Sequence, residues 1–166
     1  MGLLDLSPPF LAAARLWLEN DESPMRAHRA AERVSYHHAL AEDTPCDDAE
    51  FDLVSISFLL HELPSAAAAA VLKEAARLLK PGGVLAVIDL GAARIKTLPA
   101  LRRYLFGLTE PHVKEYMDTD VAGLMAAAGL ECIEASNNDP MNERWLARLP
   151  LSSSTGSSPT FSLTTE

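Results

Sequence analysis

Apolar and polar positions along this chain predict a succession of strands and helices. The clearest strand is Phe51–Leu60, which is apolar on both faces apart from small serines. That pattern is typical of a central parallel strand covered by helices on both sides. The alanine-rich stretch Ser65–Lys80 predicts a helix that ends at Pro81-Gly82-Gly83. Because Val84–Leu90 is again almost wholly apolar, these segments predict one right-handed βαβ unit.

The segments on either side of this unit predict an α/β fold. Before it, Gly2–Asp5 is a short apolar run that ends in a carboxylate, and Ser7 can cap a helix that starts at Pro8 and Pro9. A weaker strand is predicted at Val34–Leu40. The elements predicted after the unit are two helices, Leu98–Gly107 and Asp118–Ala128, and two strands, Leu130–Ala135 and Arg144–Leu149. We expect a mostly parallel sheet with an antiparallel C-terminal pair.

Length, composition and charge limit the domain organisation and the kinds of partner that can be expected. The 166 residues suffice for one domain; we expect it over residues 1–150, followed by a disordered Ser/Thr-rich tail at 151–166. The formal net charge of −9 repels phosphate backbones, so no nucleic-acid partner is predicted. No apolar run reaches the roughly 18 residues of a membrane span, and we expect a cytoplasmic protein. Cys46 and Cys132 have no metal-type spacing, and no metal site is predicted.

Three motifs carry a resemblance to a known family. Phe51-Asp52-Leu53-Val54, His61-Glu62-Leu63 and Lys80-Pro81-Gly82-Gly83 occur in this order. Together they resemble class I S-adenosylmethionine (SAM)-dependent methyltransferases of the small-molecule, ubiquinone-biosynthesis-like (type 11) kind. The resemblance implies a Rossmann-like sheet, SAM as cofactor and a small-molecule methyl acceptor.

The N-terminal part of the chain resembles the same family, with two departures: its opening segment, and Leu40, which stands where the family often has an Asp. Gly2–Pro8 is similar to the family's second strand with its acidic end, and Ala41–Pro45 is similar to its adenine-side turn. The family opens with a strand and a glycine-rich loop, and nothing of that kind precedes Asp5. The resemblance therefore implies a partial methyltransferase domain whose first strand and Gly-rich loop are missing.

The resemblance assigns five candidate cofactor-binding residues. Asp5, followed by Leu6, ends the first predicted strand, where a carboxylate can accept hydrogen bonds from both ribose hydroxyls. Ala41 and Glu42 fall on the adenine side. Ser57 lies toward the end of the Phe51–Leu60 strand. Each has a simpler interpretation: Asp5 can cap the helix beside Ser7, and the turn at Ala41 needs no ligand.

His61 is the candidate catalytic base, since it follows the central strand near where a methyl acceptor must approach. Methyl transfer requires in-line positioning, and a base only if the nucleophile must lose a proton. A structural histidine that bonds a loop carbonyl is the simpler interpretation. In the resembled family the stretch from Arg94 to Tyr116 caps the acceptor pocket, although an amphipathic helix explains its residues equally. These residues include Arg102, Arg103, Tyr104, Phe106, His112 and Tyr116.

Three functions remain open at this point. The first is transfer of a methyl group from SAM to a small molecule. The second is an inactive methyltransferase-like remnant that acts through protein contacts and self-associates through unpaired sheet edges. The third is a nicotinamide-binding Rossmann domain, which would also place a carboxylate where Asp5 lies.

Overall fold

A computed structural model describes residues 1–19, 33–136 and 141–151 of the chain. The tail predicted from residue 151 therefore lies, apart from Leu151, outside the described residues. The helices are α1 (Pro8–Glu19), α2 (Ser65–Leu78), α3 (Ala92–Thr97), α4 (Ala100–Thr109), α5 (Val113–Tyr116), α6 (Val121–Ala127) and the short 3-10 helix η3 (Leu60–Glu62). The strands are β1 (Gly2–Asp5), β2 (Ser35–His38), β3 (Phe51–Ser57), β4 (Leu79–Leu90), β5 (Glu131–Ser136) and β6 (Asn142–Arg148).

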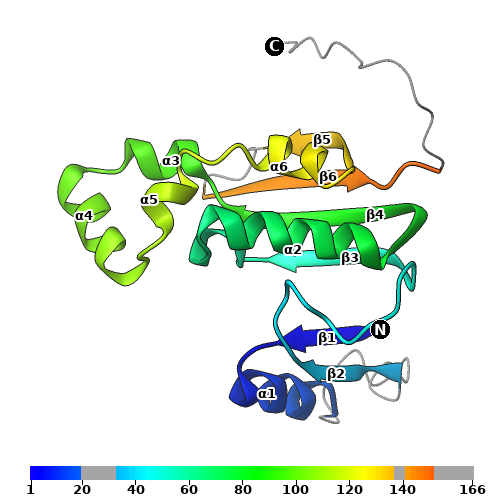
Figure 1. The fold of residues 1–166 in the computed structure, drawn as a ribbon. Coiled ribbons are helices and arrows are strands. Elements are labelled where there is room, and N and C mark those ends of the chain that lie inside the picture. Colours follow the sequence, from blue (N-terminus) through cyan, green and yellow to red (C-terminus); the bar gives the residue numbers. More distant parts are fainter. Residues whose placement is uncertain (20–32, 137–140, 152–166) are drawn as a thin grey trace.

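The strands form two separate sheets. In the small sheet β1 and β2 run parallel, with Gly2 opposite Ser35 and Asp5 opposite His38. The large sheet has the order β3-β4-β6-β5, with β3 parallel to β4 and the last two pairings antiparallel. Figure 1 shows the small sheet below the large one, with α1 beside it. The predicted α/β fold and its antiparallel C-terminal pair are confirmed.

Among the described residues, helices pack against one face of the large sheet. Helices α2 and α6 lie on that face (Figure 1), where Leu72, Leu85 and Met125 are fully buried. On the other face of β3, Leu53 is 60% exposed, and both serines of the strand are exposed as well. The prediction that helices cover both faces of this strand is therefore wrong. An all-apolar run reflects burial of one face here, and the second face stays open to solvent in the described structure.

The boundaries of β3 and β4 are among those that differ from the sequence prediction. β4 begins at Leu79, directly after α2, but its register against β3 jumps from Leu79 opposite Phe51 to Val84 opposite Leu53, so Lys80, Pro81, Gly82 and Gly83 form an irregular stretch without partners in β3. Gly82 has a φ of +83° and its N–H donates to the carbonyl of Leu149, which shows why a residue without a Cβ suits this position. β3 ends at Ser57, because the next residue has a left-handed φ of +52°.

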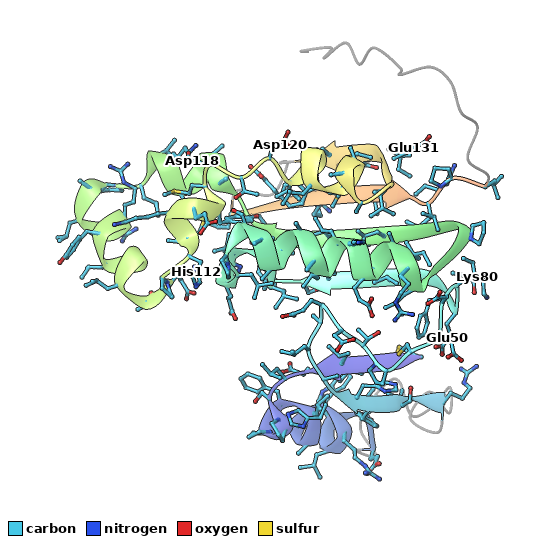
Figure 2. The ribbon with its side chains drawn as sticks, in the orientation of Figure 1. Glu50, Lys80, His112, Asp118, Asp120 and Glu131 are labelled. Atoms are coloured by element: carbon cyan, nitrogen blue, oxygen red, sulfur yellow. The ribbon has the colours of Figure 1, made fainter. Side chains whose placement is uncertain are left out.

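Helices α3, α4 and α5 lie at the end of the large sheet where β3 and β4 finish (Figure 1). Figure 2 places His112 at this end, whereas Glu50 and Lys80 lie at the opposite end, where β3 begins. Asp120 caps the start of α6, and its side chain accepts a hydrogen bond from the N–H of Gly123 at 2.9 Å. None of the described helices combines the length and the hydropathy that crossing a bilayer requires.

Candidate functional site

A cavity of about 780 Å³ lies between the two sheets. Its lining includes every cofactor-binding candidate taken from the sequence: Asp5, Leu6, Ala41, Glu42 and Ser57. These residues come from the end of β1, the loop after β2 and the end of β3. The carboxyl ends of parallel strands are where open α/β sheets collect ligands, so the fold brings the five candidates to one place.

The end of β1 is tied to the start of α1. One carboxylate oxygen of Asp5, Oδ1, accepts a hydrogen bond from the N–H of Ser7 at 2.7 Å. Asp5 therefore supports the helix start, as its simpler interpretation predicts. Its second oxygen, Oδ2, has no hydrogen-bond partner among the described residues and remains available at the cavity. The carbonyl of Leu6 bonds the ring Nε2 of His38 at 2.9 Å, which joins the segment to the end of β2.

The loop after β2 is held against α2 by a carboxylate that sequence reasoning missed. Glu74 accepts hydrogen bonds from the backbone N–H of Thr44 at 2.9 Å and from its hydroxyl at 2.6 Å. Arg77, one helical turn further on, donates to the same carboxylate at 2.7 and 2.8 Å. The hydrogen bond from Arg77, together with those from Thr44, outweighs burial and lowers the pKa of Glu74 to about 2.

Arg77 extends this network along the loop. It donates to the backbone carbonyl of Cys46 at 2.9 Å and is paired with Asp48. The bonds to Glu74 and Asp48 raise the pKa of Arg77 above its ordinary value. The loop that carries Ala41 and Glu42 is thus held by the pair of Glu74 and Arg77 on α2, which packs against the large sheet. This gives the cavity a defined wall on the side of the loop.

His61 contacts a buried carboxylate instead of the loop carbonyl expected of a structural histidine. Its ring nitrogen Nδ1 lies 2.5 Å from Oδ1 of Asp89, a fully buried residue near the end of β4. Asp89 also accepts hydrogen bonds from the backbone N–H groups of Leu60 and Leu90, at 2.8 and 2.7 Å. The pair joins the segment after β3 to the end of β4, and it fixes the orientation of the imidazole.

The surroundings of His61 favour its charged form. Burial lowers the pKa of His61, but the hydrogen bond and the charge of Asp89, with smaller contributions from Glu62 and Glu110, outweigh it and raise the pKa. The ring of Tyr116 meets that of His61 edge-on, with centroids 6.2 Å apart. The Tyr116 hydroxyl donates to the carbonyl of Leu90 at 2.9 Å, and burial raises its pKa.

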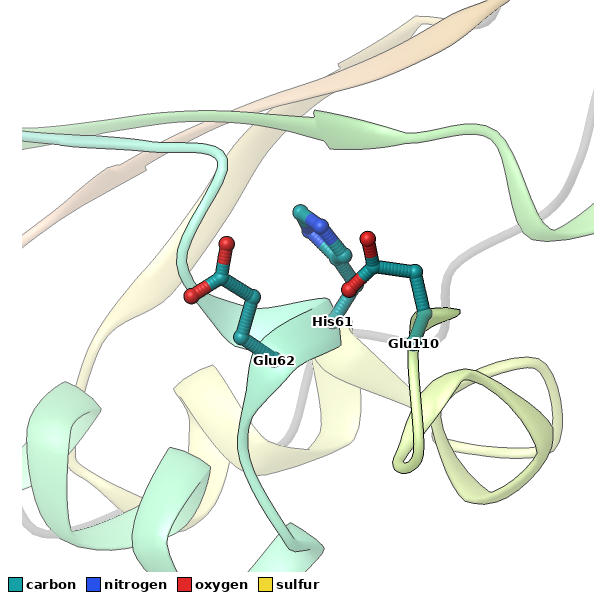
Figure 3. A group of neighbouring side chains, drawn as sticks. All are labelled: His61, Glu62 and Glu110. Carbon is teal, nitrogen blue, oxygen red and sulfur yellow. The ribbon is translucent and has the colours of Figure 1, made fainter. Parts of the chain in front are cut away.

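Figure 3 shows that the side chains of His61, Glu62 and Glu110 gather in one place. One donor atom from each lies within 4.8 Å of the others, so the cluster offers groups that can hold a proton or a cation. His61 itself is only 6% exposed and does not line the large cavity, whereas its neighbour Glu62 does. The imidazole is therefore not part of the cavity wall, although its sequence neighbour Glu62 is.

The residues predicted to cap an acceptor pocket do not reach this cavity. Arg102, Arg103 and Tyr104 are exposed on α4, and none of them is in the lining. Arg103 donates instead to the carbonyl of Lys96 at 3.1 Å.

Asp89 and Glu74 were not selected from the sequence, and each carried a different signal there. Asp89 is a carboxylate near the end of an apolar strand, which is the same signal that selected Asp5. Glu74 lies among the polar positions of a helix, where a solvated side chain is the usual expectation. Only the fold reveals that Thr44 lies opposite it.

Comparisons with known proteins agree on one family. A family model described as "Methyltransferase domain" matches residues 3–87. An uncharacterized methyltransferase of Synechocystis is 35% identical over 118 residues, which are 68% of this chain and 55% of the relative. The chain thus spans about half the length of this curated relative.

Solved structures show the same fold at low identity. A SAM-dependent methyltransferase from Methanosarcina mazei matches 91% of this chain and 82% of its own, with a TM-score of 0.70 and 16% identity. The [4+2]-cyclase SpnF matches 91% of this chain and 67% of its own, with a TM-score of 0.66 and 17% identity. Because the two differ in their named activities, the fold alone does not decide the reaction.

Proposed function

Because the chain belongs to the methyltransferase domain family, we propose that it transfers a methyl group from SAM to a small-molecule acceptor. The observation that carries this proposal is the shared cavity of Asp5, Leu6, Ala41, Glu42 and Ser57. Three chain segments far apart in sequence meet there, which supports the proposal. The family match also favours this function over the nicotinamide-binding alternative.

We assign the nucleoside part of the cofactor to the end of the cavity at Asp5. The free Oδ2 of Asp5 can accept a ribose hydroxyl, while Oδ1 retains its bond to Ser7. Glu42 can accept the exocyclic amine of adenine, and the backbone N–H groups of the fixed loop can serve a ring nitrogen. Ser57 supplies a small polar wall at the end of β3. Bound SAM would supply a sulfonium methyl group for displacement by the acceptor.

His61 is our proposed base for an acceptor that must lose a proton. Asp89 accepts at Nδ1, so the tautomer protonated there leaves Nε2 with a lone pair. The negative charges of Asp89, Glu62 and Glu110 stabilise the imidazolium that forms when the acceptor's proton is taken up. Asp89 is then a positioning residue, since it acts through His61.

Titration calorimetry with S-adenosylhomocysteine, the demethylated product, tests the cofactor assignment. Asp5→Asn is expected to weaken binding by about 10- to 100-fold, because one charge-assisted hydrogen bond is lost. Asp52→Asn is the matched control, since Asp52 is 84% exposed, pairs with Lys80 and lies outside the cavity. No heat at millimolar ligand, or equal binding by both variants, contradicts the assignment.

The role of His61 is tested by the pH profile of methyl transfer. His61→Gln is expected to remove the rising limb of kcat near the pKa of His61 while leaving product binding unchanged. His112→Gln is the control, because His112 lies at the same end of the sheet (Figure 2) but outside the cavity. Unchanged kcat with lowered stability would assign His61 a structural role only.

A second candidate function is action through protein contacts, including self-association. It is favoured by one observation: β1 and β3 each have an edge with no strand partner among the described residues. Such edges are sites where other chains add. Sedimentation at increasing concentration tests self-association, and a monomer throughout would contradict it. The cytoplasmic location expected from the sequence stays a prediction.

A further inference from the structure

Three side chains that can accept hydrogen bonds lie together just after β3 and α4. They are the carboxylates of Glu62 in η3 and of Glu110 in the loop after α4, and the imidazole of His61 (Figure 3). One ligand atom from each of these residues, the His61 cluster, lies within 4.8 Å of the other two. Because Nδ1 of His61 is bonded to Asp89, Nε2 is the ring nitrogen that remains for a ligand. Glu62 also lines the cavity, so the cluster adjoins the proposed cofactor site.

Among the described residues, no Lys or Arg side chain neutralises the His61 cluster. Neither Glu62 nor Glu110 forms an ion pair with one in that part of the chain. The side chain of His61 is 8% exposed and that of Asp89 is fully buried, and Nε2 of His61 has no hydrogen-bond partner among the described residues. Three carboxylates thus act on one imidazole, and even a protonated His61 leaves them in excess. Such a site attracts a cation that can donate hydrogen bonds.

The spacing of these ligand atoms suits an ammonium group. An ammonium has three N–H donors, and charge-assisted bonds of about 2.8 Å place its three acceptors about 4.6 Å apart. The ligand atoms of a bound zinc ion lie closer together, at about 3.4 Å, because each is about 2.1 Å from the metal. The 4.8 Å limit of the cluster accommodates the ammonium arrangement. Its three acceptors also match the three donors in number.

We propose that the methyl acceptor is a primary amine, held as its ammonium by Glu62 and Glu110 and deprotonated by His61. This inference rests on the proposed methyl transfer, because the cluster adjoins the cavity that we assign to the cofactor. An amine also accounts for a base at this place, since it is protonated at neutral pH and becomes a nucleophile only after it loses a proton. In the field of the three carboxylates the ammonium replaces the charge of a protonated His61, so a neutral His61 accepts at Nε2.

Atoms and charge balance in this reaction. Nε2 of His61 takes one proton from the ammonium, which becomes a neutral amine. The lone pair of the amine nitrogen forms a bond to the methyl carbon of SAM while the carbon–sulfur bond breaks, and the electrons of that bond stay on the sulfur of S-adenosylhomocysteine. The product is a methylammonium, and the proton on His61 passes to solvent. Until then, Asp89 stabilises the imidazolium through Nδ1.

Calorimetry with 2-phenylethylamine as the probe tests the ammonium site in the complete chain, with and without S-adenosylhomocysteine. The matched compound 2-phenylethanol has the same apolar body and no charge. We expect the amine to bind at millimolar concentration, and the alcohol to bind about 10- to 100-fold more weakly because the charge-assisted bonds are lost. Equal binding of the two compounds, or no binding of the amine, overturns the proposal.

Matched variants locate the amine. Glu62→Gln and Glu110→Gln each remove one negative charge from the cluster, and each should weaken amine binding by about tenfold. Glu131→Gln makes the same change at an exposed position at the start of β5, outside both the cavity and the cluster, and should bind the amine as the parent chain does. Circular dichroism checks that all three variants fold. Equal weakening in all three, or in none, contradicts the assigned site.

Further measurements separate this inference from the proposed function. Glu110→Gln should bind S-adenosylhomocysteine as the parent chain does, because Glu110 lies outside the cavity. A chain that binds S-adenosylhomocysteine but not the amine keeps its cofactor site and loses the amine acceptor. No binding of S-adenosylhomocysteine overturns methyl transfer, and with it the amine as acceptor, even where the amine still binds.

Two more outcomes decide the chemical class of the ligand. With SAM present, mass spectrometry should show that 2-phenylethylamine gains a methyl group and that 2-phenylethanol does not; methylation of the alcohol alone overturns the proposal. Zinc is the competing cation. Zinc binding that Glu110→Gln weakens and that the amine does not displace would assign the cluster to a metal ion and overturn the ammonium site.

Discussion

The two sheets are held by different forces, and the candidate site lies at the junction between them. The large sheet rests on a continuous core with Leu72, Leu85 and Met125 at its centre. No residue of α1, β1 or β2 belongs to that core. Leu11 and Leu18 of α1 are buried but lie outside that core. The small sheet should therefore be the less stable of the two.

The connection between the two sheets is made by polar side chains, whereas the core of the large sheet is apolar. Glu74 and Arg77 hold the loop at Thr44 and Cys46, and this loop leads from β2 to β3. A ligand in the cavity contacts one wall built on the core and a second wall held by hydrogen bonds. Ligand binding and the stability of the small sheet should therefore be coupled, since a ligand that contacts both walls favours their folded arrangement.

The largest effect on the stable region is expected from Asp89→Ala. The change leaves His61 and the N–H groups of Leu60 and Leu90 without their buried acceptor. Removing one partner of a buried pair costs about 3–5 kcal/mol, measured here as the free energy of unfolding in urea. Asp118→Ala removes an exposed pair with Lys96 and should cost no more than about 1 kcal/mol. Similar losses in both variants would contradict the structural importance of the buried pair.

A pair of leucine truncations compares the two regions directly. Leu85→Ala, at a fully buried position in β4, should cost about 2–5 kcal/mol in the unfolding of the whole chain. Leu18→Ala, at a buried position of α1 outside the large core, should cost less and act locally. Hydrogen exchange should then accelerate in β1 and β2 while β4 stays protected. If Leu18→Ala exposed β4 equally, the two sheets would form one cooperative unit, and the comparison would fail.

Breaking the polar connection should have a smaller effect. Glu74→Gln removes the charge that accepts from Thr44 and Arg77, and we expect a loss of about 1–3 kcal/mol at neutral pH. The pKa of Glu74 falls from 4.5 to about 2 on folding. Its stabilisation is therefore present above pH 4.5 and is lost as the pH falls toward about 2. Urea unfolding at several pH values measures both effects.

The control for this change is Glu131→Gln, since Glu131 is exposed at the start of β5. It should leave both the stability and its acid dependence unchanged. If the free energy of unfolding fell with decreasing pH in the same way in the parent chain and in Glu74→Gln, the carboxylate would not hold the loop.

Local patterns in the sequence predict much of this fold. β1, α1 and the C-terminal antiparallel pair follow from apolar periodicity and from helix-start residues such as Ser7 and Pro8. The boundary between α2 and β4 was predicted less accurately, since the strand was expected from Val84 and begins at Leu79. The register against β3 shifts across Lys80–Gly83, and Gly82 and Gly83 exchange backbone hydrogen bonds with Leu149 instead. The local preference of Pro81 and the two glycines for a turn therefore persists within the strand, and contacts with Leu149, which is distant in sequence, hold it there.

The candidate site was also predictable from the sequence only in part. Asp5 and Ser57 could be chosen because the ends of strands are visible in the sequence, and both line the cavity. Partners that meet only across the fold could not be predicted. The contact of Glu74 with Thr44 joins positions 30 residues apart, and that of His61 with Asp89 joins positions 28 apart. No periodic pattern encodes such distances.

The smallest expected effect is the contribution of His61 to the pH dependence of stability. It tests the part of the site that is built on the large sheet. The pKa of His61 in the folded chain lies above the ordinary value because Asp89, Glu62 and Glu110 face it, with Tyr116 packed against the ring. A raised pKa means that the stabilisation is complete below about pH 6.5 and is lost as the pH rises through the folded value. The difference in unfolding free energy between the parent chain and His61→Gln should therefore be constant below about pH 6.5 and shrink as the pH rises above it. Glu110→Gln should move this decline to lower pH, whereas a difference that stays constant with pH would show that His61 is neutral throughout and that the acidic cluster does not act on it.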